Sequence, residues 1–305
     1  MDSLLPIPPG IRNICSRALI DVGTSATRIG SRLWETEPSS TAPLSKLLNG
    51  QELMASGFSG VSLSLAAGTD QFHAFAQLMR TDVHFGPSLA TLARSTIESL
   101  GRGWWLLSAD SAELMRHRAT AMGLAEARAG ARHGVAVRRF FPNGRHEAVE
   151  DPIAAAQELF DAARIAGEDA AVPRYGALAR AILEAAGVES PAAVYSHLSG
   201  AAHGERSTVG GLGSRNPGSD GEVAQFKLRM PIRNARMYCW VLIQVLDVTM
   251  VRLINLWDVQ AEHERWAQSY ARSADTLEKI FAWVLAYEPS DEAAGTLYGP
   301  NGLDA

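Results

Sequence analysis

The chain of 305 residues is poor in cysteine and in lysine. Cys15 and Cys239 lie far apart and lack Cys-x-x-Cys spacing, which argues against a disulfide framework and against a thiolate zinc site. Lysine occurs at three positions, so arginine carries most of the positive charge. The formal net charge of −5 argues against non-specific polyanion binding by the whole molecule, although it permits a local basic patch.

The sequence also lacks a long uninterrupted apolar run. Its first residues, Met1–Pro6, have neither the basic region nor the apolar core of a secretory signal peptide. Residues 237–254 are strongly apolar, but the run is shorter than the roughly 20 residues of a membrane span and contains Gln244, Asp247 and Arg252. These features predict a buried core helix, no membrane segment and a cytoplasmic protein.

Strand patterns are scarce, and helical periodicity dominates the chain. Apolar residues recur at helical spacing, and prolines and capping residues mark several helix starts. The predicted helices cover residues 11–34, 60–79, 87–107, 110–131, 151–167, 173–187, 191–203, 231–257 and 259–287. They predict an all-α fold, a single-domain bundle of about eight helices over residues 1–289.

Three segments depart from the helical pattern. Residues 134–149 contain a Pro-Asn-Gly turn signal and predict one short hairpin or irregular excursion. Residues 204–221 are rich in glycine and predict a mobile loop inside the domain. Residues 290–305 predict a flexible C-terminal tail.

A polar stripe is the most informative local signal. Tyr195, Ser199 and His203 follow one another at four-residue intervals, so on a helix each is turned only about 40° from the last. Their neighbours are mainly small or apolar, so the stripe must face water or find polar partners. As catalytic groups they would supply an acidic phenol, an orienting hydroxyl and a general base. As a structural group, His203 beside Gly204 would cap the helix end.

A second polar pair lies upstream in an apolar helix. Arg94 and Glu98 stand at i and i+4, where an ion pair can form on one helix face. The pair is either a structural clamp between helices or part of a functional site. An unsatisfied buried polar group costs about 1–3 kcal/mol, so we expect this pair to lie within hydrogen-bond reach of Tyr195, Ser199 or His203. The isolated Asp247 is expected to join them, with Arg94 as its favoured partner.

A basic stretch follows this helix. Between residues 116 and 146 the chain carries seven arginines and three histidines against one acid, Glu126. Arginine neutralises phosphate and aromatic rings stack on bases, so this composition suits a single-stranded nucleic acid. The residues predicted for such a patch are Arg116, Arg132, Arg138, Arg139 and Phe140. The acidic residues that follow, from Glu147 onward, could instead consume this charge in local salt bridges.

Fingerprints of cofactor and metal sites are absent from the sequence. Residues 210–217 lack the third glycine of a dinucleotide fingerprint and the Gly-Lys-Ser/Thr of a P-loop, and they follow a predicted helix rather than a strand. His197 and His203 are rotated about 120° from each other on a helix, so they do not form a ready metal pair. We therefore predict neither a metal nor a cofactor.

Three motifs carry a resemblance to known proteins. Asp70–Leu78, Thr91–Glu98 and Tyr195–Gly204 resemble a group of helical proteins common in actinobacteria, and the last motif is the most specific. More remotely, the order of helices is similar to HEPN-type proteins, which include abortive-infection toxins. The resemblance implies a helical bundle, often dimeric, sometimes with ribonuclease activity from an Arg and a His four to six residues apart.

Two functions are consistent with these patterns. In the first, the chain is a non-catalytic helical interaction or regulatory protein, and the polar residues form a buried network that fixes helix register. In the second, it is a HEPN-like, metal-independent ribonuclease or toxin acting on RNA or nucleotides. There Arg94 and Glu98 would position phosphate and orient the base, while His203 transfers protons.

Overall fold

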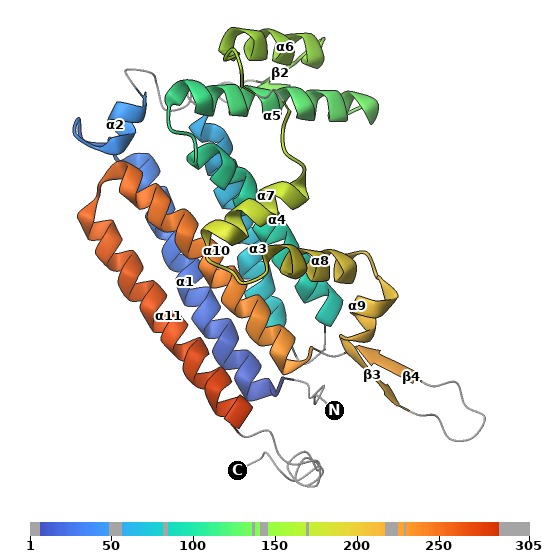
Figure 1. Ribbon diagram of the computed structural model, residues 1–305. Coiled ribbons are helices and arrows are strands. Elements are labelled where there is room, and N and C mark those ends of the chain that lie inside the picture. Colours follow the sequence, from blue (N-terminus) through green and yellow to red (C-terminus); the bar gives the residue numbers. More distant parts are fainter. Residues whose placement is uncertain are drawn as a thin grey trace.

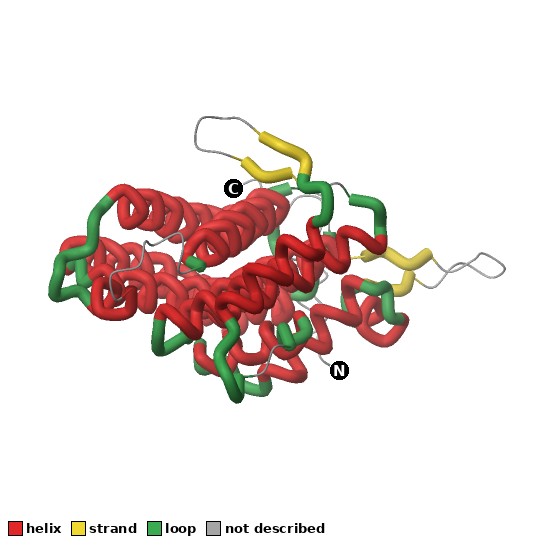
Figure 2. The backbone as a smooth tube through the Cα atoms, turned by 90° about the horizontal axis from the view of Figure 1, so that it is seen from above, coloured by secondary structure: helices red, strands yellow, loops and turns green. Residues whose placement is uncertain are grey.

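The computed structural model describes residues 7–48, 57–81, 85–135, 138–140, 146–168, 171–216, 225–228 and 230–286 (Figures 1 and 2). Within these ranges the chain forms eleven helices and two antiparallel hairpins. The helices are α1 (Pro9–Glu35), α2 (Pro43–Leu48), α3 (Phe58–Met79), α4 (Gly86–Leu107), α5 (Ala112–Arg132), α6 (Pro152–Ala163), α7 (Tyr175–Ala185), α8 (Pro191–Ala202), α9 (Arg206–Gly210), α10 (Ile232–Trp257) and α11 (Gln260–Ala286). The strands are β1 (Arg138–Phe140), β2 (His146–Ala148), β3 (Gly213–Asn216) and β4 (Gln225–Leu228).

Several helices begin and end where local chemistry requires it. The Ser111 side chain accepts a hydrogen bond from the Leu114 amide at 3.1 Å, which caps α5. Helices α1, α4, α6 and α8 have proline in their first turn, where its missing N–H costs nothing. Gly204 has a φ of +71°, the left-handed conformation that commonly ends a helix, and it follows the last turn of α8.

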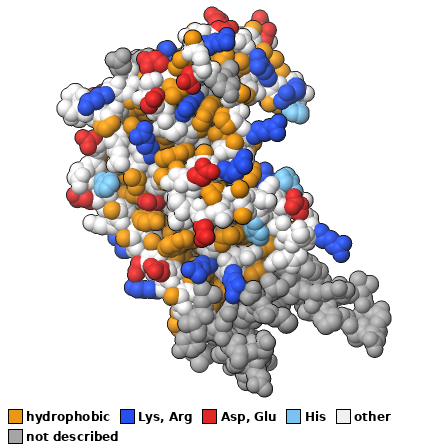
Figure 3. Space-filling model, in the orientation of Figure 1, with side chains coloured by type: hydrophobic (Ala, Val, Ile, Leu, Met, Phe, Trp, Pro, Cys, Tyr) orange, Lys and Arg blue, Asp and Glu red, His pale blue; other side chains and the backbone are white. Residues whose placement is uncertain are grey.

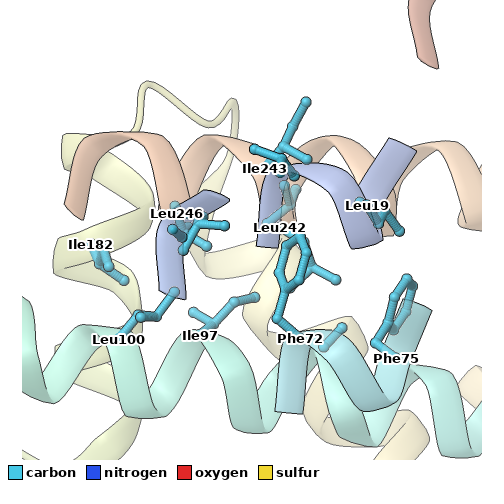
Figure 4. Close-up of a cluster of buried hydrophobic side chains, with 14 of the residues drawn as sticks. Leu19, Phe72, Phe75, Ile97, Leu100, Ile182, Leu242, Ile243 and Leu246 are labelled. Atoms are coloured by element: carbon cyan, nitrogen blue, oxygen red, sulfur yellow. The ribbon is translucent and has the colours of Figure 1, made fainter. Parts of the chain in front are cut away.

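The main core lies among the long helices. Helix α3 packs on α4 and α1, and α10 packs on α1, α4 and α11 (Figure 1). In Figure 4, Ile97 of α4 and Leu246 of α10 point into the same cluster, which Phe72 of α3 and Leu19 of α1 also enter. All four side chains are buried. This contact among four helices fixes the position of α4, the helix that carries Arg94 and Glu98.

Helix α10 is apolar because it lies in this core. Its length and composition would allow it to cross a membrane, but 61% of its most apolar window is buried inside the protein. The neighbouring helices α1, α4 and α11 cover its apolar faces. Packing within the bundle thus accounts for its apolar composition.

Helices α5 and α6 form a satellite at one end of the bundle. Figure 1 shows α5 crossing above the long helices, with α6 lying on its outer side. A separate small core joins the two helices through Leu124 and Phe160. Arg128 of α5 also donates a hydrogen bond to Gln157 of α6 at 2.9 Å.

Helices α7 and α8 cover the remaining side of α4. The close approach of α7 depends on Gly101, because a Cβ atom at that position would lie 2.9 Å from the backbone oxygen of Leu178. Helix α8 also contacts α10, through a 2.8 Å hydrogen bond between His197 Nε2 and the Tyr238 hydroxyl. Burial lowers the pKa of His197. Burial therefore favours the neutral form of this imidazole.

The all-α prediction is confirmed, whereas the finer prediction differs in the number of helices and in the number of hairpins. The described residues contain eleven helices rather than about eight, because α2 and α9 are too short to give a clear periodicity. One hairpin, β1–β2, falls within the predicted excursion at 134–149. A second hairpin, β3–β4, was not predicted (Figure 2).

The prediction of a loop over residues 204–221 was wrong for its described part. Residues 206–210 form α9, and residues 213–216 form β3, which pairs with β4 from Gly213 opposite Leu228 to Asn216 opposite Gln225. The sequence signal was glycine content, which a tight helix-to-hairpin connection shares with a loop. Residues 217–221 and the predicted tail at 290–305 lie outside the described residues.

Candidate polar site between helices α4 and α8

The two motifs predicted to meet lie against each other. Arg94 and Glu98 of α4 form an ion pair, with Arg94 Nε 2.8 Å from Glu98 Oε1. The Tyr195 hydroxyl of α8 donates to the same Glu98 oxygen at 2.7 Å. Arg94 also reaches the end of α8, where its terminal nitrogen lies 3.0 Å from His203 Nε2. Arg94, Glu98, Tyr195 and His203 are hereafter called the α4–α8 network.

Glu98 is the hub of this network. Its Oε1 atom accepts from both Arg94 and Tyr195, whereas its Oε2 atom has no hydrogen-bond partner among the described residues. The Glu98 side chain retains 17% of its exposure and the Arg94 side chain 21%, so the pair is screened from water without being sealed. Hydrogen bonds to a charged group in such surroundings are stronger than neutral ones.

The network shifts the pKa values of its members. Burial lowers the pKa of Arg94, but the hydrogen bond and negative charge of Glu98 outweigh it and raise the pKa overall. Burial and the adjacent Glu98 carboxylate both raise the pKa of Tyr195, with Arg94 opposing them. At neutral pH the arginine is therefore charged, and the phenol remains a hydrogen-bond donor.

His203 stands at the solvent-exposed edge of the network. It follows the last residue of α8, and its own amide bonds back to the carbonyl of Ser199 at 3.0 Å. A guanidinium has donors and no acceptor, so the contact with Arg94 requires His203 Nε2 to accept.

Two predicted members of the site lie outside the network. The Ser199 hydroxyl makes no hydrogen bond to the other side chains among the residues that the structure describes. Asp247 accepts a hydrogen bond from Trp266 of α11 at 2.8 Å, so the prediction that Arg94 is its partner was wrong. The reason is topological: α11 packs along α10 and supplies a closer donor than α4 does.

Glu98 is one of the residues that line a groove of about 490 Å³. Helices α3, α4, α5 and α7 line it, and Ser95, Ser99 and Gln71 make part of its polar wall. Ser99 donates to Gln71 at 3.0 Å, which fixes both side chains. Among the four network residues, Glu98 is the one that lines this groove.

A second polar cluster, which was not predicted from the sequence, also lines the groove. Arg102, one turn after Glu98, forms an ion pair with Glu126 of α5. It also donates to the Tyr175 hydroxyl of α7 at 3.0 Å, and its guanidinium lies 5.8 Å from the centre of that ring. The i, i+4, i+8 spacing of Arg94, Glu98 and Arg102 was a signal that could have extended the predicted stripe.

The residues of the predicted nucleic-acid patch are divided between α5, which holds Arg116 and Arg132, and β1. Arg116 and Arg132 are 16 residues apart, which places them about 160° from each other around the helix. The Arg116 Nε atom is buried and has no hydrogen-bond partner among the described residues. Arg138, Arg139 and Phe140 lie in β1, where Arg139 is in register with Glu147. Figure 3 shows acidic and basic side chains interspersed over much of the face of the molecule that it draws. Basic side chains gather near the right-hand end of α5.

Comparisons with protein-family models, with curated proteins and with solved structures found no match for this chain.

Proposed function

We propose that the protein is a non-catalytic helical interaction or regulatory protein in which the α4–α8 network clamps α8 onto α4. The observation that carries the proposal is the set of side-chain hydrogen bonds that joins α4 to α8. Glu98 Oε1 accepts from Arg94 and Tyr195, and Arg94 also donates to His203. Groups engaged in this way hold two helices in one register without any substrate.

The groove beside Glu98 supplies the interaction surface. Its volume of about 490 Å³ falls in the range of small-ligand sites. The Oε2 atom of Glu98 can accept a hydrogen bond from an occupant while Oε1 remains in the network. Because Glu98 belongs to both the groove and the network, an occupant that donates to Glu98 would directly affect the contact between α4 and α8. This is the regulatory element of the proposal.

Three variants test the clamp: Arg94→Ala, Glu98→Ala and His203→Ala. Each removes hydrogen bonds worth about 1 kcal/mol in a partly exposed site, so the melting temperature should fall by about 2–4 °C per variant. Hydrogen exchange of the α8 amides should also become faster. Arg180→Ala is the matched control, because the Arg180 Nε donates to the Gly176 carbonyl of its own helix.

The clamp is ruled out if all three variants have the melting temperature of the wild-type protein and leave hydrogen exchange in α8 unchanged. A uniform acceleration of exchange over the whole bundle would also count against it, since a clamp acts on α8 locally. The control variant should alter neither the melting temperature nor the exchange of α8.

A HEPN-like ribonuclease or toxin is the second candidate. The observation in its favour is the 3.0 Å contact between Arg94 and His203, which places an arginine beside a histidine at an exposed helix end. In that role Arg94 would bind phosphate and release His203 Nε2 to accept a proton. Wild-type protein would then cleave RNA or be toxic on expression, and His203→Ala would abolish the effect. Absence of both effects in the wild type excludes this candidate.

A further inference from the structure

Arginines line a second groove, on the edge of the bundle opposite the α4–α8 network. It lies between α1 and α11, which run side by side along that edge in Figure 1, and its volume is about 490 Å³. Four arginines line it, two from each helix: Arg28, Arg32, Arg265 and Arg272. This is an unusual concentration of positive charge in a chain whose net charge is −5.

A buried carboxylate holds two of these arginines in place. Glu262 of α11 is only 5% exposed. Its Oε2 atom accepts from Arg32 at 2.8 Å, and its Oε1 atom accepts from Arg265. A guanidinium has five N–H donors, so each arginine keeps unused donors after this contact. The arginine side chains remain 47% and 55% exposed, which leaves those donors accessible.

The other two arginines form no ion pair within the part of the chain that the structure describes. These residues, Arg28 and Arg272, are exposed. Asp21 is the acidic residue that lines the groove. With Glu262 it offsets two of the four positive charges and leaves a surplus of two. Arg28 and Arg32 also stand at i and i+4, where like charges repel.

The walls of the groove are fixed against each other. Ser273 of α11, which is buried, donates to the Ala18 carbonyl of α1 at 2.9 Å. Ser269 is 5% exposed and, with Thr24 and Ser25, places hydroxyl groups along the groove. A ligand would therefore meet preorganised charge and hydroxyl donors, a combination that suits phosphate oxygens.

We propose that this groove binds a small, multiply charged phosphate compound, such as a diphosphate or triphosphate group. The surplus of two positive charges matches an anion that carries at least two negative charges. The groove is large enough for such a group and a modest organic substituent, and its four arginines can contact more than one phosphate. The ligand would relieve the repulsion among the guanidinium groups that the unliganded protein sustains.

The probes for the test are inorganic pyrophosphate, inorganic triphosphate and ATP, with sulfate, a dianion with a single tetrahedral group, as the comparison. Isothermal titration should show pyrophosphate and triphosphate binding far more tightly than sulfate, with affinity falling as salt is raised. Tighter binding of ATP than of triphosphate would identify a nucleotide as the source of the phosphates. Equal binding would identify the phosphate chain itself.

Arg28→Gln and Arg272→Gln remove the two unpaired charges. Each should weaken pyrophosphate binding by about tenfold or more, since charge-assisted hydrogen bonds are lost. Without ligand both variants should melt at or above the wild-type temperature, because repulsion is relieved. Arg164→Gln combined with Arg236→Gln removes two exposed arginines elsewhere and should leave binding unchanged.

Four results would overturn the proposal. Pyrophosphate and triphosphate could fail to bind the wild type at millimolar concentration. They could bind both groove variants as tightly as the wild type. Alternatively, the two groove variants and the control could lose affinity equally, which would indicate a general charge effect. Finally, the protein could bind single-stranded RNA through Arg28 and Arg272 without binding pyrophosphate. That result would show that the groove binds a macromolecule and not a small ligand.

Discussion

Glu98 Oε1 accepts hydrogen bonds from Arg94 and Tyr195, so one carboxylate oxygen joins α4 to α8. The need for partners made this contact predictable, because polar residues on apolar helices must be satisfied. The partner of Asp247 was not predictable in the same way. Sequence spacing does not reveal that Trp266 of α11 lies closer to Asp247 than Arg94 does.

Asp247 leads to a prediction about pH. Burial raises its pKa, while the hydrogen bond from Trp266 and the charge of His263 oppose the shift. The folded state therefore binds the proton more tightly than the unfolded state, and stability falls as pH rises above the unfolded value of about 4. Asp247→Asn keeps an acceptor for Trp266 and removes the charge, so it should raise the melting temperature at pH 7.

The advantage of Asp247→Asn should shrink as the pH is lowered toward about 4, where the aspartate of the wild type becomes neutral as well. Thermal melts of both proteins between pH 4 and pH 8 provide the measurement. Equal melting temperatures at pH 7, or an advantage that grows on acidification, would show that Asp247 is not destabilised by its surroundings.

At the scale of elements, helical periodicity in the sequence predicted the long helices but not the short ones. Helix α4 was predicted as 87–107 and observed as Gly86–Leu107, because its apolar face repeats over many turns. Helices α2 and α9 hold six and five residues, too few for the pattern to emerge. The cluster of Arg102, Glu126 and Tyr175 joins three helices, and no local spacing reveals which of them meet.

A substitution at Gly101 tests how closely α7 packs on α4. In Gly101→Ala the new Cβ atom would lie 2.9 Å from the Leu178 oxygen and 3.0 Å from the Leu178 carbonyl carbon, so the backbone of α7 must move. We expect a loss of about 1–3 kcal/mol in the free energy of unfolding. Denaturant titration followed by circular dichroism measures it.

Gly123→Ala is the matched control for this substitution. Gly123 also lies inside a helix, but a Cβ atom there would meet nothing within 4 Å. Alanine is the better helix former, so this variant should gain about 0.5–1 kcal/mol. If both alanine variants gained stability, α7 would not be seated as closely on α4 as the structure indicates.

For the whole molecule, the two polar regions lie in different parts of the bundle. The α4–α8 network and its groove involve α3, α4, α5, α7 and α8, whereas the arginine groove lies between α1 and α11. Helical periodicity predicted an all-α bundle. The net charge permitted a local basic patch, but it could not place that patch. The arginines of the groove come from both ends of the sequence, and only the packing of α1 on α11 brings them together.

The clamp between α4 and α8 is the central claim, and a double-mutant cycle tests it most directly. Glu98→Ala and Tyr195→Phe each remove one side of the 2.7 Å hydrogen bond. Their combined effect on the free energy of unfolding should differ from the sum of the single effects by a coupling of about 0.5–2 kcal/mol. Tyr195→Phe paired with Asp275→Ala, an exposed carboxylate on α11, should be additive. Equal, near-zero coupling in both cycles would contradict the clamp.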